Sequence, residues 1–171
     1  MQRAVRYVRS HAGEWNIDPH RIGVLGFSAG GHLSSLASTH FTFGNSNASD
    51  PVERVSSRPD VQVLIYPVID FELSYRPCSA LLGDADMPDR ELLINLSTYL
   101  SVTSETPPAF LVHGIKDKLV PIENSIKYAN SLQEKNVSVE LLRADWGGHG
   151  FGMNEKWTIP CESWLKTQWN F

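Results

Sequence analysis

The 171-residue sequence has no long apolar run and no excess of positive charge. No stretch approaches the roughly 18 consecutive apolar residues of a transmembrane helix, and the start, MQRAVRYVRS, lacks the apolar core of a signal peptide. The formal net charge is −4, and acidic and basic residues are interspersed, which provides no basic face for nucleic acid and no polybasic patch for a lipid surface. We therefore expect neither a nucleic-acid partner nor a membrane partner.

Cysteines and ligand-binding motifs are also scarce. Cys78 and Cys161 are the two cysteines; we expect two buried thiols, with a single disulfide as the alternative. The glycines have neither the G-x-x-x-x-G-K-[ST] nor the G-x-G-x-x-G spacing of phosphate-binding loops. No His, Cys, Asp or Glu residues cluster at the spacing of metal ligands. The sequence therefore predicts that neither a metal nor an organic cofactor is required.

The hydrophobic pattern predicts one domain over residues 1–171. No repeat or long linker divides the chain, and 42% hydrophobic residues are enough for a core. Four β-rich runs alternate with runs of helical period, and the first three β-rich runs are apolar throughout, as in parallel strands buried on both faces. The expected strands are 21–27, 61–68, 109–114 and 137–144, and the expected helices are 2–15, 29–39, one within 90–100, 122–134 and a C-terminal one around 157–169. This alternation predicts an α/β fold in which helices flank a parallel sheet.

The segment GFSAGG follows the first β-rich run and begins a helical run. Gly26-Phe27-Ser28-Ala29-Gly30 fits G-x-S-x-G, in which a sharp strand-to-helix turn lifts a nucleophilic serine above the sheet. Side chains two residues before and after the serine would collide in such a turn, so we expect glycine to be required on both flanks. The turn also places the Ala29 amide at a helix N-terminus, where it can donate to an oxyanion. The alternative is a glycine-rich turn with an incidental serine.

A nucleophilic serine needs a histidine base, which in this type of fold follows the serine and the acid along the chain. His149, in the glycine-rich segment DWGGHGFG, lies between the last predicted strand and the C-terminal helix, and it is the favoured base. His113, which closes the third strand, is the alternative. Among the other four histidines, His32 lies on the helix after the serine, and we expect it to pack or to cap that helix.

The acid that orients the histidine has two candidates at strand ends. Asp117, in HGIKDKLVP after the third strand, is favoured, and Asp70, after the second strand, is the alternative. Asp145 is expected to shape the histidine loop, and Asp84 and Asp86 are expected to be solvated. The carboxyl ends of parallel strands meet at one edge of a sheet, where ligands bind in such folds. The residues therefore predict a Ser-His-Asp triad at that edge.

Three segments in order, RIGVLGFSAGGHL, TPPAFLVHGIKDKLVP and GGHGFG, resemble the nucleophile, acid and histidine segments of the α/β-hydrolase superfamily. Within it, they are similar to acetyl esterase and acetyl xylan esterase-like enzymes, and the resemblance runs from about Gln2 to Trp164. It implies that Ser28, Asp117 and His149 are the catalytic triad. It also implies small acyl esters as substrates, with acetyl groups on plant polysaccharides or their fragments suggested.

The chain departs from this family upstream of Ser28. Family members carry further strands and an HGG-type loop there, and the loop supplies a second oxyanion-hole amide. About twenty residues precede the elbow strand here, and no HGG stands among them. The sequence therefore resembles the C-terminal part of the fold, with about four strands. We expect slow hydrolysis by the isolated chain, and either a homo-oligomer that covers the edge of IGVLGF or a poorly soluble monomer.

The leading functional hypothesis is a serine esterase acting on a small-molecule or carbohydrate ester. A peptidase or amidase with the same triad is one alternative, and an impaired remnant that acts as an interaction module is another. Phe41, Trp146 and Phe151 could line a substrate groove, but core packing is the expected role of each. The resemblance implies residues before Met1, where a signal peptide would lie, so this sequence does not predict a cellular compartment.

Overall fold

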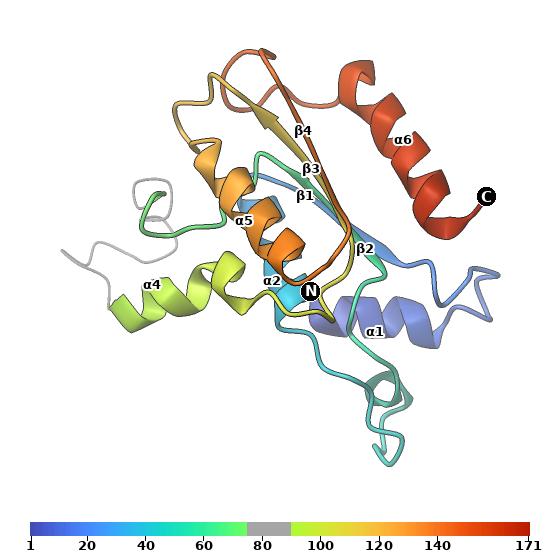
Figure 1. Cartoon of the computed structure of the whole chain (residues 1–171). Coiled ribbons are helices and arrows are strands. Elements are labelled where there is room, and N and C mark those ends of the chain that lie inside the picture. The colour runs from blue at the N-terminus through green and yellow to red at the C-terminus, as the bar shows by residue number, and fades with distance from the viewer. Residues whose placement is uncertain (75–89) are drawn as a thin grey trace.

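The computed structural model describes residues 1–74 and 90–171, so the predictions for Cys78, Asp84 and Asp86 fall outside the described residues. The described residues form a four-stranded parallel sheet in the order β1-β2-β3-β4, which confirms the predicted α/β fold (Figure 1). The elements in chain order are α1 (Gln2–Ser10), β1 (Gly23–Phe27), α2 (Ala29–Thr39), the 3₁₀ helix η1 (Pro51–Arg54), β2 (Val61–Ile65), α4 (Arg90–Leu96), the 3₁₀ helix η2 (Thr98–Ser101), β3 (Ala109–Gly114), α5 (Glu123–Glu134), β4 (Val139–Ala144) and α6 (Glu155–Trp169). Within these ranges, no helix is both long and apolar enough to cross a membrane.

Helices cover both faces of the sheet (Figure 1). On one face, α6 packs Trp157, Cys161 and Trp164 against alternate residues of β2 and β3. On the other face, α5 packs Tyr128 and Leu132 against the intervening residues of the same strands. Alternate side chains of a strand point to opposite faces, so the continuous apolar runs of β2 and β3 supply both cores. Every residue of these two strands is buried, as predicted.

The edge strand β1 differs from the prediction that it is buried on both faces. Val24 is buried against Val5 of α1, but the side chain of Leu25, which points to the opposite face, leaves the residue 49% exposed. Leu25 pairs in register with Val63, whose side chain belongs to the cluster beneath α6. The exposure of Leu25 shows that α6 leaves this part of β1 uncovered. The pattern of apolar residues did not reveal this, because it indicates what a strand can bury and not which helix reaches it.

Several predicted elements are shorter in the structure. The first helix ends at Ser10 and not at residue 15, and Asn16 has a left-handed φ of 54°. The second strand ends at Ile65 and not at residue 68, because Tyr66 has a φ of 38°, outside the range of a strand. The helix expected within residues 90–100 is two elements, α4 and η2. The third strand, residues 109–114, has the predicted bounds.

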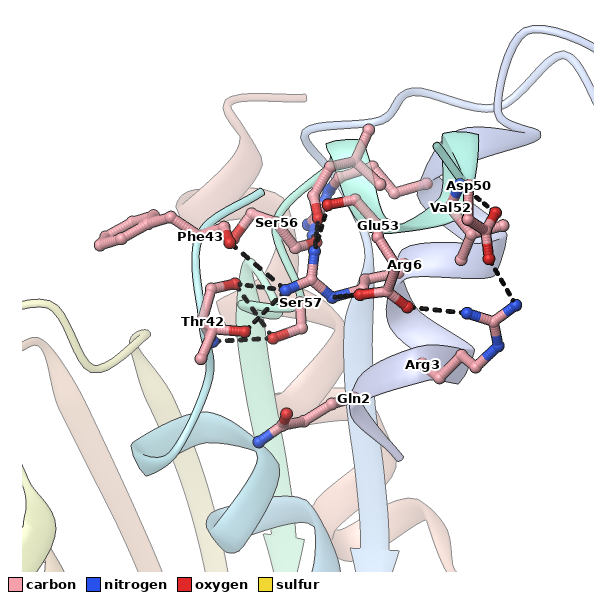
Figure 2. Close-up of polar contacts among 12 residues, drawn as sticks. Gln2, Arg3, Arg6, Thr42, Phe43, Asp50, Val52, Glu53, Ser56 and Ser57 are labelled. Carbon is pink, nitrogen blue, oxygen red and sulfur yellow. Dashed lines mark hydrogen bonds and ion pairs between the residues drawn. The ribbon is translucent and has the colours of Figure 1, made fainter. Parts of the chain in front are cut away.

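Arginines spaced three residues apart fasten the segment before β2 to α1 (Figure 2). Arg3 forms ion pairs with Asp50 and Glu53, and Arg9 forms one with Asp60. Arg6 is buried, and its guanidinium donates to backbone carbonyls of four residues: Thr42, Phe43, Glu53 and Val55. The five donors of a guanidinium satisfy several carbonyls at once, so this segment, which contains the short helix η1, is anchored to α1 through side chains.

Candidate active site

Ser28 lies in the turn between β1 and α2, with φ of 52° and ψ of −117°. A positive φ is strained for a residue with a side chain, and such strain is typical of functional turns. Two backbone hydrogen bonds stabilise the turn: the Ser28 amide donates to the Ile65 carbonyl at 2.9 Å, and the Val68 amide donates to the Ser28 carbonyl at 3.3 Å. The last residue of β2 and the segment that follows it therefore hold the backbone of Ser28 from both sides.

The glycines around Ser28 have unequal roles. A Cβ added at Gly26 would lie 2.0 Å from the Gly30 carbonyl oxygen, and one at Gly31 would lie 2.8 Å from Cβ of Pro67. A Cβ added at Gly30 meets no described atom within 4 Å outside its own stretch of helix. The expectation that both flanking positions require glycine is therefore wrong for Gly30. The close approach is between the Gly26 backbone and the Gly30 carbonyl, and an alanine at position 30 would still have that carbonyl.

We expect Gly26→Ala to lower the free energy of unfolding by about 3 kcal/mol or more, because backbone atoms must move to admit the methyl group. Gly30→Ala should leave stability unchanged or raise it by about 0.5–1 kcal/mol, since alanine is the better helix former. Urea-induced unfolding of the two variants, followed by circular dichroism, measures the difference. Equal stabilities would contradict this account of the turn.

The structure brings together the three side chains that the sequence predicted as a triad. His149 Nε2 lies 2.8 Å from Ser28 Oγ, and His149 Nδ1 lies 2.7 Å from Asp117 Oδ2. Ser28 follows β1, Asp117 follows β3 and His149 follows β4, so all three lie at the carboxyl edge of the sheet. The Asp117 side chain is 1% exposed and that of His149 is 17% exposed. A carboxylate accepts hydrogen bonds, so His149 Nδ1 carries the proton and Nε2 is free to accept one from the serine.

The alternative base and the alternative acid are engaged elsewhere. The ring nitrogens of His113 contact Ser125 Oγ at 2.7 Å and the Val120 carbonyl at 2.9 Å. Asp70 accepts hydrogen bonds from the backbone amides of the turn that follows it, and it forms an ion pair with Lys127 of α5. Both residues therefore fix local structure near the sheet edge.

An ion pair joins the acid loop to the histidine loop. Lys116 Nζ lies 2.5 Å from Asp145 Oδ2. This hydrogen bond lowers the pKa of the Asp145 carboxyl. Asp145 thus shapes the histidine loop, as expected, and the sequence did not indicate Lys116 as its partner.

An aromatic wall supports the imidazole of His149. The Tyr66 ring lies 4.6 Å from the His149 ring and 4.7 Å from that of Phe151, between centroids, and burial raises the pKa of the Tyr66 hydroxyl. Trp146 and Phe151 also pack on the core beneath α6, as expected. Phe41 instead contacts Phe43 and Arg58. Tyr66 was missed from the sequence because YPV continues the apolar run of β2, and no local signal shows that the chain turns there.

His32, one turn after Ser28, is buried and packs against Phe71 with ring centroids 4.7 Å apart, as expected for a packing residue. Burial lowers its pKa from 6.5 to about 4. The folded state therefore favours the neutral ring. Its contribution to the free energy of unfolding is fully present above pH 6.5 and is lost as the pH falls through about 4.

We expect the free energy of unfolding to fall by about 3 kcal/mol between pH 6.5 and pH 4 through His32. His32→Gln should flatten that part of the curve, whereas His20→Gln, which replaces an exposed histidine, should leave it unchanged. Chemical denaturation at each half pH unit provides the curves. Parallel curves for wild type and His32→Gln would show that His32 contributes nothing to acid sensitivity.

Among the described residues, no three His, Cys, Asp or Glu side chains are grouped as a metal site requires. Ala29 is the first residue of α2, so its amide lies at the positive end of the helix, beside Ser28.

Comparison with known proteins identifies the family. The model of the BD-FAE family matches residues 1–132 of the 171. The chain belongs to the BD-FAE family. The crystal structure of an acetyl ester-xyloside bifunctional hydrolase from Caldicellulosiruptor lactoaceticus superposes with a TM-score of 0.91 at 47% identity, over 97% of this BD-FAE chain and 63% of that chain.

Curated relatives of the BD-FAE chain are named as esterases. Acetylxylan esterase from Xylanibacter ruminicola is 37% identical over 98% of this chain and 35% of that protein. Probable carboxylic ester hydrolase LipM from Mycobacterium tuberculosis is 29% identical over 78% of this chain and 33% of that protein. These relatives confirm the resemblance to α/β-hydrolase esterases of the acetyl xylan esterase type. The BD-FAE chain spans about a third of the length of these two proteins.

Proposed function

We propose that this protein hydrolyses carboxylic esters of small acyl groups, with Ser28 as nucleophile, His149 as general base and acid, and Asp117 as the group that orients the histidine. One observation supports this most strongly: the unbroken series of contacts from Ser28 Oγ to His149 at 2.8 Å and from His149 to Asp117 at 2.7 Å. Serine is a weak nucleophile until a base removes its proton, and this geometry supplies the base and its orienting acid.

The reaction has two halves. Ser28 Oγ attacks the ester carbonyl while His149 Nε2 takes the hydroxyl proton, and the Asp117 carboxylate stabilises the resulting imidazolium. The Ala29 amide donates to the oxyanion of the tetrahedral intermediate. His149 then gives the proton to the departing alkoxide, which leaves as the alcohol, and an acyl-enzyme remains. Water attacks the acyl-enzyme with His149 again as base, and the carboxylic acid and free Ser28 are released.

Acetyl esters of carbohydrates are the proposed substrates. The names of two relatives, an acetylxylan esterase and an acetyl ester-xyloside hydrolase, support this class. Rates should be compared on aryl acetate, aryl octanoate and an aminoacyl aryl amide, with acetate release from acetylated xylo-oligosaccharides measured in parallel. We expect the acetates to be cleaved fastest. Faster cleavage of the amide would favour the peptidase alternative.

A fluorophosphonate probe tests whether the serine is activated, independently of substrate choice. The folded chain should be labelled covalently at Ser28. Folded protein that takes up no label would instead favour the alternative of an impaired remnant that acts as an interaction module.

We also propose that the chain forms homo-oligomers through the edge of β1. This strand lies at one end of the sheet, and Leu25 on it is 49% exposed. An apolar strand edge without a partner favours association. Size-exclusion chromatography with light scattering measures the mass directly. A well-behaved monomer at high concentration would contradict this proposal.

A further inference from the structure

His113 is a buried polar residue that the proposed reaction does not use. It is the next-to-last residue of β3, it is 0% exposed, and it precedes Asp117 by four residues. Both of its ring nitrogens have partners. Nδ1 lies 2.7 Å from Ser125 Oγ on α5, and Nε2 lies 2.9 Å from the backbone carbonyl of Val120. The ring therefore links β3, α5 and the loop that holds the acid.

These partners determine where the proton of His113 lies. The Val120 carbonyl is an acceptor, so Nε2 must carry the proton and donate it. Nδ1 then has a lone pair, which accepts the hydrogen bond from the Ser125 hydroxyl. Burial lowers the pKa of His113, which keeps the ring neutral and suits this arrangement. The tautomer of His113 is thus set by a backbone carbonyl and a buried hydroxyl.

The same contacts hold the turn that presents Asp117. Asp117 Oδ1 accepts hydrogen bonds from the amides of Leu119 and Val120, both at 3.0 Å. His113 holds the carbonyl of Val120, so Val120 is tied on one side to Asp117 and on the other to His113. With Oδ1 occupied, Oδ2 is left to face His149. His113 Nε2 also lies 3.6 Å from Oδ2, which places the positive end of its N–H beside the carboxylate.

We infer that His113 is a positioning residue for the proposed catalytic acid. Its Nε2–H fixes the turn formed by residues 117–120, and the turn aims Asp117 Oδ2 at His149 Nδ1. This inference rests on the proposed function for its effect on rate, but its structural part, the direction of the carboxylate, can be tested without activity.

Three substitutions at position 113 separate the effect of the hydrogen-bond donor at Nε2 from the effect of the volume of the ring. In His113→Gln, the side-chain amide reaches about as far as Nε2 and can still donate to the Val120 carbonyl. In His113→Asn, the amide is too short to do so, and His113→Leu has no donor. Tyr128→Phe is the matched control, because it removes another buried hydrogen bond of α5, the 3.0 Å contact with Gln62, away from the turn.

We expect kcat for ester hydrolysis to fall by about 10–100-fold in the Leu and Asn variants, with KM nearly unchanged, because misplacement of a catalytic group slows chemistry more than binding. The Gln variant should recover to within about fivefold of wild type, and the Tyr128→Phe control should match wild type. A His113→Gln variant as slow as His113→Leu would overturn the inference, and so would Leu and Asn variants as fast as the control. If His113→Leu does not fold, the Asn and Gln variants decide the outcome.

Crystal structures of the Asn and Gln variants provide the test that needs no activity. We expect the contact between Asp117 Oδ2 and His149 Nδ1 to be broken in the Asn variant and kept in the Gln variant. An intact contact in both would overturn the inference. If the wild type neither hydrolyses esters nor reacts with the fluorophosphonate, the proposed function fails, while these structures still decide the role of His113.

Discussion

Replacing Ser28 by alanine is expected to lower kcat for ester hydrolysis by about 10⁴–10⁶-fold and to abolish labelling by a fluorophosphonate. The reason is that the alanine variant has no atom to form the acyl-enzyme, so any remaining reaction must use water in place of the serine. His149 would lose its 2.8 Å partner, but the backbone bonds between the turn and the end of β2 would remain. The variant should therefore unfold at nearly the same denaturant concentration as the wild type.

Ser34 provides a matched control for this experiment. It lies on α2, the helix that begins directly after Ser28, it is 0% exposed, and its hydroxyl has no hydrogen-bond partner within the described part of the chain. Ser34→Ala removes the same atom as Ser28→Ala, and we expect its kcat and its labelling to match those of the wild type. Activity that survives in Ser28→Ala but is lost in Ser34→Ala would refute the assignment of the nucleophile.

Replacing Asp117 by asparagine is expected to lower kcat by about 10⁴-fold. The amides of Leu119 and Val120 require an acceptor, so the asparagine oxygen should take the place of Oδ1 and its NH₂ group should face His149. An NH₂ donor facing Nδ1 favours the tautomer with the proton on Nε2, and that tautomer cannot accept the serine proton. Steady-state kinetics on an aryl acetate measure the loss. A decrease of less than about tenfold would contradict the assignment.

Asp70→Asn is the control for this carboxylate, because Asp70 is the other acid that follows a strand. Its partners are the turn amides of Glu72 and Leu73 and the side chain of Lys127, so it stabilises the segment after β2. We expect kcat to change by less than about fivefold and the free energy of unfolding to decrease, because the buried carboxylate loses the charge that pairs it with the partly exposed Lys127. A loss of kcat as large as that of Asp117→Asn would reopen the choice between the two carboxylates.

Local sequence patterns predicted the buried elements better than the exposed ones. The third strand, 109–114, has the expected bounds because it is apolar throughout, follows Pro107 and Pro108, and ends at Gly114. The first strand has the same apolar character, but Leu25 is half exposed, since coverage depends on where α6 lies. The end of the second strand was misplaced because the positive φ of Tyr66 arises from its surroundings and not from its residue type.

The order of strands and helices, the turn at Ser28 and a short set of candidate histidines and aspartates can all be read from the amino-acid sequence, because each depends on neighbouring residues. Within that set the sequence favoured Asp117 and His149, and the folded chain supplies the contacts that distinguish them from Asp70 and His113. Asp70 and Asp117 both follow an apolar strand, whereas His113 lies inside β3 and His149 lies in the glycine-rich loop after β4. The contacts that distinguish them join residues 121 and 32 positions apart. Such contacts depend on how parallel strands align and how the loops beyond them pack, and hydrophobic periodicity does not encode either.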